Sequence, residues 1–490
     1  MTGSKIEADA LAAMRGGRLQ DALVIARRGV VGATSLLPVH ALLATILLKL
    51  DLRRDAEAVV EGAFRLEPGT GDACDALAYV SLMLGSHEQA NKLYHRAVAQ
   101  SPQNARFWYN LASSERSFGR LKEAETACNR SIALDPEHYS SYLLRSELLV
   151  QTPQSNHLEE LERQVARLDL DDRGRVVLGY ALAKELDDLQ QFSAAFRWFK
   201  VASAARRRLL SYDIAGDEHK LCRVIEAFPA DLVAATAPAG SSGRYAFIIG
   251  LPRSGTTLVE RILSGHKGVI SNGETDNFMR ALLACAPANG SDIFARAAAA
   301  DPACVARQFS KLADSGSPLG RSTSDLVVEK LPMNYLYLGA IHRALPAASL
   351  IWVKRSPLDS CFALYRTLFG EACPFSYDFE ELARYYSAYE KLMQHWQHAL
   401  GARLHEVRYE DLVADPKQIG SAMVRYCGLS WEETAVEVER NASVSLTASA
   451  AQIRRPIYGT SSNRWRHYAA ELKPLIDALR RRGIDVPNDV

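Results

Sequence analysis

One segment of the sequence combines residue types that bind a phosphate or sulfate group. Residues 247–260, FIIGLPRSGTTLVE, place an apolar run before a glycine- and hydroxyl-rich loop and a helical pattern. Free backbone amides at the start of a helix, together with side-chain hydroxyls, can donate hydrogen bonds to an anion. The hydroxyls in this loop belong to Ser254, Thr256 and Thr257. Gly255 allows close approach of the backbone, and Arg253 adds a permanent positive charge. The segment predicts an anion-binding loop between a strand and a helix.

The spacing of this loop is close to that of the phosphate loop of nucleoside-triphosphate enzymes, with one essential difference. Four residues separate Gly250 from Gly255, but Thr256 stands where such loops carry a lysine. The later apolar run 350–353 continues into two basic residues, whereas a magnesium-dependent enzyme would have an aspartate there. A P-loop kinase is therefore disfavoured, and it stays open as an alternative that dependence on ATP and magnesium would reveal.

The sequence PRSGTT after an apolar run resembles the 5′-phosphosulfate loop of sulfotransferases that use PAPS, 3′-phosphoadenosine 5′-phosphosulfate. The resemblance covers about residues 244–468. It is greatest to the tyrosylprotein sulfotransferase branch and to bacterial proteins that fuse tetratricopeptide repeats to this domain. It implies transfer of a sulfuryl group from PAPS to an acceptor hydroxyl, with 3′-phosphoadenosine 5′-phosphate as the other product. Residues 253–257 would hold the 5′ end of PAPS, and no metal is expected.

A second motif, residues 349–369, resembles the strand-helix unit that holds the 3′-phosphate in this family. Arg355 matches the arginine that binds this phosphate, for which a forked guanidinium is well suited. Relatives usually carry a serine eight residues later, where this sequence has Ala363. Ser360 or Arg366 could substitute, or the affinity could be lower, since one hydrogen bond to a charged group contributes about 1.5–3 kcal/mol. Ala363 is also consistent with a scaffold whose catalytic domain has decayed, which absent nucleotide binding would reveal.

The resemblance also assigns catalytic roles. Transfer to a hydroxyl needs a base on the acceptor and cations on the departing oxygen. Glu274 lies where the family has its catalytic glutamate, 21 residues after Arg253, although a shift by one residue is left open. Lys330 and Ser449 match residues that, with Arg253, stabilise the transferring group and the departing oxygen. Structural roles remain as alternatives, a helix cap for Glu274 and a surface lysine for Lys330.

Two further positions match nucleotide contacts of the family. Residues 447–468 resemble its C-terminal nucleotide lid, in which Arg464 would reach the phosphates of PAPS. Tyr409, in the segment RYEDL, matches a residue that contacts the adenine. Without the resemblance, the lid segment would be interpreted as a solvated basic loop.

The elements that must position these residues alternate between strands and helices. Short β-rich runs occur at residues 245–250, 326–328, 349–353 and 404–407. Helical segments such as 256–263 and 378–400 separate them. Alternation of this kind predicts an α/β domain with a parallel sheet.

The first part of the chain repeats with a period of 34 residues. Prolines recur at positions 68, 102 and 136, Leu-Ala pairs begin at 43, 77 and 111, and alanines recur at 56, 90 and 124. Small residues where two helices cross permit close packing, and each proline ends the second helix. This pattern resembles the tetratricopeptide repeat, with three good copies over residues 37–136 and an irregular helical pair at about 178–199.

These patterns predict an all-α tetratricopeptide-repeat solenoid at residues 1–227 and an α/β, P-loop-like sulfotransferase domain with a parallel sheet at 244–490. The linker is predicted at 228–243, FPADLVAATAPAGSSG, because this segment is rich in Ala, Pro, Ser and Gly.

Composition limits the classes of partner. The formal net charge is +1, which does not favour binding to nucleic acid. The most apolar stretch, residues 36–50, is shorter than a membrane span, and the N-terminus lacks the pattern of a secretory signal. The eight cysteines are scattered without a dense framework, so we expect reduced thiols and a cytoplasmic protein.

The family branch and the repeats together suggest an acceptor. Repeat arrays of this kind present a concave surface to peptides or proteins. The first hypothesis is therefore sulfation of a protein or peptide tyrosine that the repeats engage. A carbohydrate, lipid or small phenol stays open as the acceptor, as does the oligomeric state.

Overall fold

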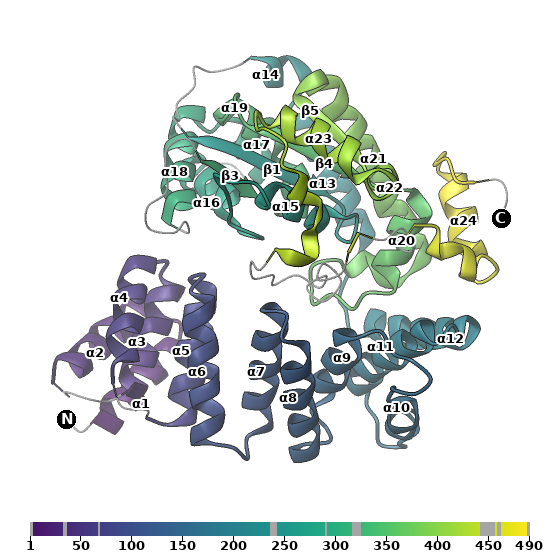
Figure 1. Ribbon diagram of the computed structural model, residues 1–490. Helices are drawn as coiled ribbons and strands as arrows, with labels where there is room; N and C mark the ends of the chain where they lie inside the picture. Colours follow the sequence, from purple (N-terminus) through teal and green to yellow (C-terminus); the bar gives the residue numbers. More distant parts are fainter. Residues whose placement is uncertain are drawn as a thin grey trace. The chain divides into compact units, whose positions relative to one another are not determined.

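The computed structural model describes residues 3–32, 37–66, 69–235, 243–289, 292–315, 325–441, 456–457 and 462–487 (Figure 1). By its contacts the chain divides into two compact units, Met1–Val150 and Gln151–Val490. Over the described ranges, none of the helices combines the length and the apolar character that a bilayer crossing requires.

The first unit consists of helices that pack in antiparallel pairs (Figure 1). They are α1 (Gly3–Arg15), α2 (Leu19–Gly32), α3 (Leu37–Lys49), α4 (Arg53–Phe64), α5 (Gly71–Met83), α6 (His87–Gln100), α7 (Ala105–Ser117), α8 (Leu121–Leu134) and α9 (Tyr139–Leu148). The repeated small residues are fully buried between the paired helices, as the 34-residue period predicts; they are Ala44, Ala78, Ala112, Ala56, Ala90 and Ala124.

The turn inside each helix pair repeats as faithfully as the core. Asp51, Gly85 and Gly119 stand 34 residues apart, and each has a positive φ, of 59°, 87° and 78°. A left-handed residue at this position ends the first helix and reverses the chain. The predicted all-α repeat is therefore confirmed, and its turns are found to repeat with the same period.

The second unit begins with further helices. They are α10 (Leu158–Val165), α11 (Asp172–Asp188), α12 (Phe192–Arg208), α13 (Ile214–Ala227) and α14 (Ala230–Ala234). Phe196 of α12 packs against Tyr365 and Tyr468, and α13 and α14 pack on the long helix α21 (Phe379–Leu400). The division by contacts thus falls at Val150, and the sequence-based division into 1–227, 228–243 and 244–490 stays a prediction.

A parallel sheet of five strands forms the centre of the second unit, in the order β2-β3-β1-β4-β5. The strands are β1 (Arg244–Gly250), β2 (Val269–Ser271), β3 (Leu326–Glu329), β4 (Ser349–Lys354) and β5 (Leu404–Arg408). Four of them coincide with the predicted β-rich runs, which confirms the α/β fold. The short strand β2 was not predicted.

Helices cover both faces of this sheet. Ala246 and Ile248 of β1 belong to one core cluster with Val259, whereas Phe247 points to the other face and packs against Phe278 and Phe309. The remaining helices are α15 (Thr256–Ser264), α16 (Asn277–Cys285), α17 (Ile293–Ala298), α18 (Pro302–Ser315), α19 (Leu338–Ala344), α20 (Pro357–Tyr365), α22 (Tyr409–Ala414), α23 (Pro416–Tyr426) and α24 (Lys473–Arg481). Short 3-10 turns are η1 (Pro332–Tyr337), η2 (Pro374–Tyr377), η3 (Gly401–Arg403), η4 (Glu433–Val436), η5 (Val438–Arg440) and η8 (Arg464–Tyr468).

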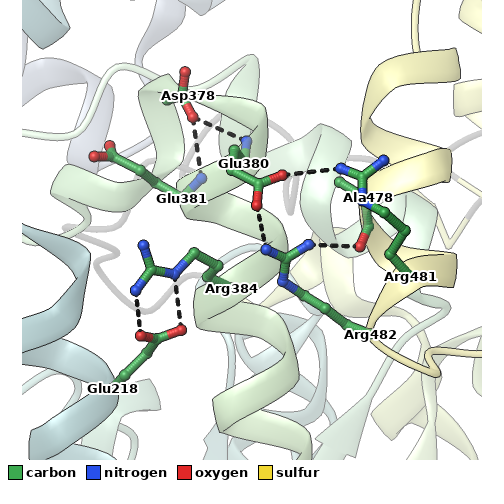
Figure 2. A network of polar contacts seen from close by, with 8 residues as sticks. All are labelled: Glu218, Asp378, Glu380, Glu381, Arg384, Ala478, Arg481 and Arg482. Atoms are coloured by element: carbon green, nitrogen blue, oxygen red, sulfur yellow. Dashed lines mark hydrogen bonds and ion pairs between the residues drawn. The ribbon is translucent and has the colours of Figure 1, made fainter.

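An ion-pair network ties helix α21 to its neighbours (Figure 2). Arg384 makes a two-pronged contact with Glu218 of α13, with Nε to Oε1 at 2.9 Å and Nη2 to Oε2 at 2.5 Å. On the other side, Glu380 accepts hydrogen bonds from Arg481 and Arg482 at the end of α24. These side chains are partly or largely exposed, so each pair adds only modest stability. The network nevertheless links α13 to the C-terminal helix through α21.

A disulfide corrects the expectation that all eight cysteines are reduced. Cys285 at the end of α16 and Cys304 in α18 are bonded, with their Cα atoms 6.0 Å apart, and the other six cysteines are thiols. The sequence did not reveal the pair, because the two cysteines are 19 residues apart and meet only through the packing of α16 against α18. The expected cytoplasmic location, which relied in part on reduced thiols, stays a prediction.

Candidate active site

The predicted anion-binding loop connects the end of β1 to the start of α15. Gly250 and Gly255 have φ angles of +154° and +107°. A Cβ on Gly250 would lie 2.6 Å from the carbonyl oxygen of Val353, and one on Gly255 would overlap the ring of Tyr409. Both positions therefore require glycine. The non-glycine residue Arg253 also has a positive φ, 68°, a conformation that costs energy and is concentrated at functional sites.

The hydroxyls of this loop are buried. Thr256 and Thr257 begin α15, and Ser254 is 2% exposed. The Ser254 Oγ has no hydrogen-bond partner within the described part of the chain. A buried unpaired hydroxyl costs about 1–3 kcal/mol, and here it lies beside the free amides of a helix N-terminus. This arrangement fits an anionic group such as the 5′ end of PAPS.

Arg355 and Tyr409 adjoin the same loop. Arg355 follows strand β4, and its Nη1 donates to the carbonyl oxygen of Arg253 at 2.9 Å. The guanidinium carbon of Arg355 lies 4.8 Å from the centroid of the Tyr409 ring, and Asp359 lies 3.8 Å from its Nη2. The fold thus brings together the loop residue Arg253 and the two residues predicted to hold the 3′-phosphate and the adenine.

Glu274 and Lys330 form an ion pair, with Lys330 Nζ 2.5 Å from Glu274 Oε1. The Lys330 side chain is fully buried, whereas that of Glu274 is 42% exposed. A second carboxylate, Glu260 of the loop helix α15, lies 3.5 Å from the same Nζ. Lys330 is therefore no surface lysine, and Asp276, not Glu274, precedes helix α16. Because Glu260 is four residues after Thr256, the pair lies about one helical turn from the start of α15, where the anion loop ends.

A buried glutamate that the sequence analysis missed holds the segment that carries Glu274. Glu329 accepts hydrogen bonds from Asn272 Nδ2 at 2.7 Å, from Asn277 Nδ2 at 3.1 Å and from Thr275 Oγ1. Burial raises the pKa of Glu329, and the three donors offset part of this rise. The only sequence signal was an acidic residue directly before Lys330 at the end of an apolar strand.

Arg464 takes part in a second cluster, which contains another missed residue. Asp187 of α11 is 2% exposed; its Oδ2 lies 2.6 Å from Arg464 Nη2 and 3.2 Å from Arg366 Nη1. Tyr468 donates its hydroxyl to the other carboxylate oxygen. Burial alone would raise the pKa of Asp187, but Arg366 and Arg464 together lower it below its ordinary value. The remaining predicted residue, Ser449, lies outside the described residues.

Comparison with known proteins gives two family matches. Residues 246–433 match a model described as the sulfotransferase family, and residues 76–139 match a tetratricopeptide-repeat model. An uncharacterised protein of Aquifex aeolicus (strain VF5) is 26% identical over 403 residues, which are 80% of this chain and 52% of that protein. The chain therefore spans about half the length of this relative.

Solved structures resemble each part of the chain separately. The sulfotransferase domain of the Synechococcus PCC 7002 olefin synthase is 20% identical and covers 50% of this chain and 96% of its own, with a TM-score of 0.35. YrrB, a TPR protein with an unusual peptide-binding site, is 16% identical and covers 39% of this chain and 89% of its own, with a TM-score of 0.28. The two family matches thus cover separate parts of the chain, a region similar to the sulfotransferase family and a region of tetratricopeptide repeats.

Proposed function

We propose that this chain transfers a sulfuryl group from PAPS to an acceptor hydroxyl, with a protein or peptide tyrosine as the first candidate acceptor. One observation carries the proposal: the buried Lys330 pairs with the accessible Glu274 next to a loop whose buried Ser254 hydroxyl has no partner in the described structure. A sulfotransferase needs these three functions together, namely a base, a cation and an anion cradle.

The loop residues and the two arginines would hold the co-substrate. Arg253 to Thr257 would bind its 5′ end, Arg355 and Arg464 its phosphates, and Tyr409 its adenine. PAPS supplies the sulfuryl group and leaves as 3′-phosphoadenosine 5′-phosphate. A kinase would instead need a lysine in place of Thr256.

Glu274 would accept the proton of the acceptor hydroxyl, because its side chain is the exposed member of the pair. While Glu274 is ionised, the Lys330 ammonium has two carboxylate neighbours, Glu274 and Glu260. Once Glu274 takes a proton, its attraction for Lys330 falls. The ammonium charge then becomes available to stabilise negative charge on the departing oxygen. Proton transfer and charge stabilisation are thereby coupled through one ion pair.

The tetratricopeptide repeats favour a protein or peptide acceptor, since such arrays commonly bind polypeptides. A carbohydrate, a lipid or a small phenol would use the same base and the same cation. The acceptors are therefore distinguished by whether turnover depends on the repeats.

The experiment is a calorimetric titration of 3′-phosphoadenosine 5′-phosphate into the full chain, with ATP and magnesium as the control ligand. Binding of the bisphosphate that is abolished by Arg355→Ala, without binding of ATP, is the expected result. A preference for ATP would favour the kinase alternative. Absence of binding to either nucleotide would favour a decayed scaffold.

A further inference from the structure

We propose that Arg366 is the second cation of the 3′-phosphate site and that Asp187 of helix α11 is the positioning residue that orients Arg366 and Arg464 toward this phosphate. The inference rests on the proposed use of PAPS. It gives Arg366 a role within the second phosphate motif and adds Asp187, which lies far from the phosphate motifs in sequence. It also gives helix α11, which precedes the sheet by more than fifty residues, a role in the nucleotide site.

The expected serine donor is missing from helix α20. Ala363 offers no polar group, and the hydroxyl of Ser360 donates to the carbonyl oxygen of Arg355 at 3.2 Å. Arg366 is the first residue after this helix. It is thus the next positively charged side chain after Arg355 in this segment, and its guanidinium can donate hydrogen bonds to an anion.

A continuous set of polar contacts joins Arg355 to Arg464. Asp359 lies 3.8 Å from Arg355, and its other carboxylate oxygen accepts from the backbone amide of Asn463 at 2.8 Å. The next residue is Arg464, whose Nη2 is 2.6 Å from Asp187. The segment that carries Arg464 is therefore fixed beside the predicted phosphate-binding arginine.

Arg366 joins the same cluster through Asp187. Burial lowers the pKa of Arg366, and the positive charges of Arg464 and Arg355 lower it further. Arg366 Nη1 and Arg464 Nη2 both approach the same oxygen of Asp187, at 3.2 Å and 2.6 Å, so these two guanidiniums lie close enough to repel each other, and the charge of Arg355 adds to this repulsion. The three guanidiniums face two carboxylates, Asp187 and Asp359, so that the cluster keeps one excess positive charge. A phosphate dianion would relieve the repulsion, as clusters of arginine commonly do for phosphate.

The location of Asp187 argues against a purely local structural role. Asp187 and Asp188 end helix α11, where the helix dipole disfavours negative charge. Asp188 is compensated within its own surroundings, by Lys184 Nζ at 2.6 Å and by the backbone amide of Gln151 at 2.8 Å. The partners of Asp187 instead come from the segments after α20 and in η8. An acidic residue that is locally unfavourable and faces two arginines is typical of a functional site.

The contacts of Asp187 with Arg366 and Arg464 both involve its Oδ2. Oδ2 lies near both guanidiniums, whereas Oδ1 accepts from Tyr468. The tyrosine hydroxyl thereby fixes the plane of the carboxylate. Fixing this plane sets the direction of both guanidiniums, which is what a positioning residue must do.

The test measures how strongly the protein prefers a nucleotide with a 3′-phosphate. The full chain is titrated with 3′-phosphoadenosine 5′-phosphate and with adenosine 5′-monophosphate, which lacks that group. The dissociation constant of the monophosphate divided by that of the bisphosphate measures the preference for the 3′-phosphate, and this ratio is compared among variants. The variants are Arg366→Gln, Arg366→Lys, Asp187→Asn and, as the matched control, Asp188→Asn. Asp188→Asn removes the same charge one residue further along the helix but leaves both arginines paired.

The ratio is expected to fall about tenfold or more for Arg366→Gln and Asp187→Asn, because each change removes or misdirects a charge-assisted hydrogen bond to the phosphate. Arg366→Lys should recover part of the loss, and Asp188→Asn should stay within about twofold of the wild type. Thermal melting of each variant identifies any that fail to fold. If Arg366→Gln is one of them, the ratio measured for Arg366→Lys, which keeps the charge, is used in its place.

Two results would overturn the inference in distinguishable ways. A wild-type preference for the bisphosphate that survives Arg366→Gln and Asp187→Asn would show that this cluster is structural, while leaving the proposed function intact. Failure of the wild type to bind either nucleotide would overturn the proposed function and the inference together.

Discussion

Removal of the Glu329 side chain should disable transfer without disturbing the nucleotide site. In Glu329→Ala, the donors of Asn272, Thr275 and Asn277 lose their shared acceptor, and the segment that carries Glu274 loses its anchor. A hydrogen bond to a charged group contributes about 1.5–3 kcal/mol, and desolvation of the buried carboxylate offsets part of this. We therefore expect the free energy of unfolding to fall by about 2–4 kcal/mol.

The effect on rate should be larger than the effect on binding. A displacement of about 1 Å in a reacting group can cost about 100-fold in rate, and the Lys330–Glu274 distance of 2.5 Å depends on this segment. The rate of sulfuryl transfer in single turnover should therefore fall about 100-fold. The dissociation constant of 3′-phosphoadenosine 5′-phosphate should stay within about threefold, because Glu329 does not contact the anion loop in the described structure.

Glu329→Gln is the matched control. Its carbonyl oxygen can still accept from Asn272 and Asn277, and the Thr275 hydroxyl can turn to accept from the new amide. This variant should keep a rate close to that of the wild type. Transfer at the wild-type rate in Glu329→Ala would refute the anchoring role, and equal damage in both variants would show that the charge of Glu329 is itself required.

The same residue should also affect the pH dependence of stability. Because burial raises the pKa of Glu329, the folded protein binds this proton more tightly than the unfolded chain. Its contribution to stability is therefore full below the ordinary pKa of glutamate, about 4.3, and is lost as the pH rises through the raised value. The pH profile of chemical denaturation should be flatter in Glu329→Gln over this interval. Parallel profiles would contradict this assignment.

Three further predictions concern other parts of the molecule. Gly255→Ala should abolish binding of 3′-phosphoadenosine 5′-phosphate in calorimetry, because the φ of +107° and the Tyr409 ring exclude a Cβ; unchanged affinity would count against the loop. Deletion of Met1–Val150 should leave a folded protein that sulfates a small phenol normally but a tyrosine peptide about tenfold more slowly, and equal losses would rule out delivery by the repeats. Reduction of Cys285–Cys304, which closes a loop of 19 residues, should lower the unfolding free energy by about 3 kcal/mol in denaturant titrations, and a thermostability indifferent to reductant would contradict the bond.

The sequence was sufficient for elements whose pattern is local. The 34-residue period predicted the helix pairs because each repeat must bury the same small residues, such as Ala78 and Ala112. The apolar runs predicted four strands because a parallel strand is buried on both faces. Strand β2 was missed because Val269–Ser271 is only three residues long, too short for a recognisable pattern.

The residues of the candidate site also differ in whether a local sequence pattern marks them. Arg253 and Arg355 belong to compact motifs, and the fold brings them into contact. Asp187 and Glu329 act through side chains distant in sequence, so no local pattern marks them. The link from α11 to η8 spans 277 residues, and only the folded chain reveals it.

The most direct test of the central claim is transfer of radiolabelled sulfate from PAPS to a simple phenol and to a tyrosine peptide, with wild type compared against Glu274→Gln. The proposed mechanism predicts labelled product with the wild type, and a Glu274→Gln variant that binds 3′-phosphoadenosine 5′-phosphate normally yet transfers at least about 100-fold more slowly. Wild-type rates in Glu274→Gln would contradict its role as the base. Absence of labelled product from both acceptors, in a wild-type protein that also fails to bind the bisphosphate, would contradict the sulfotransferase function itself.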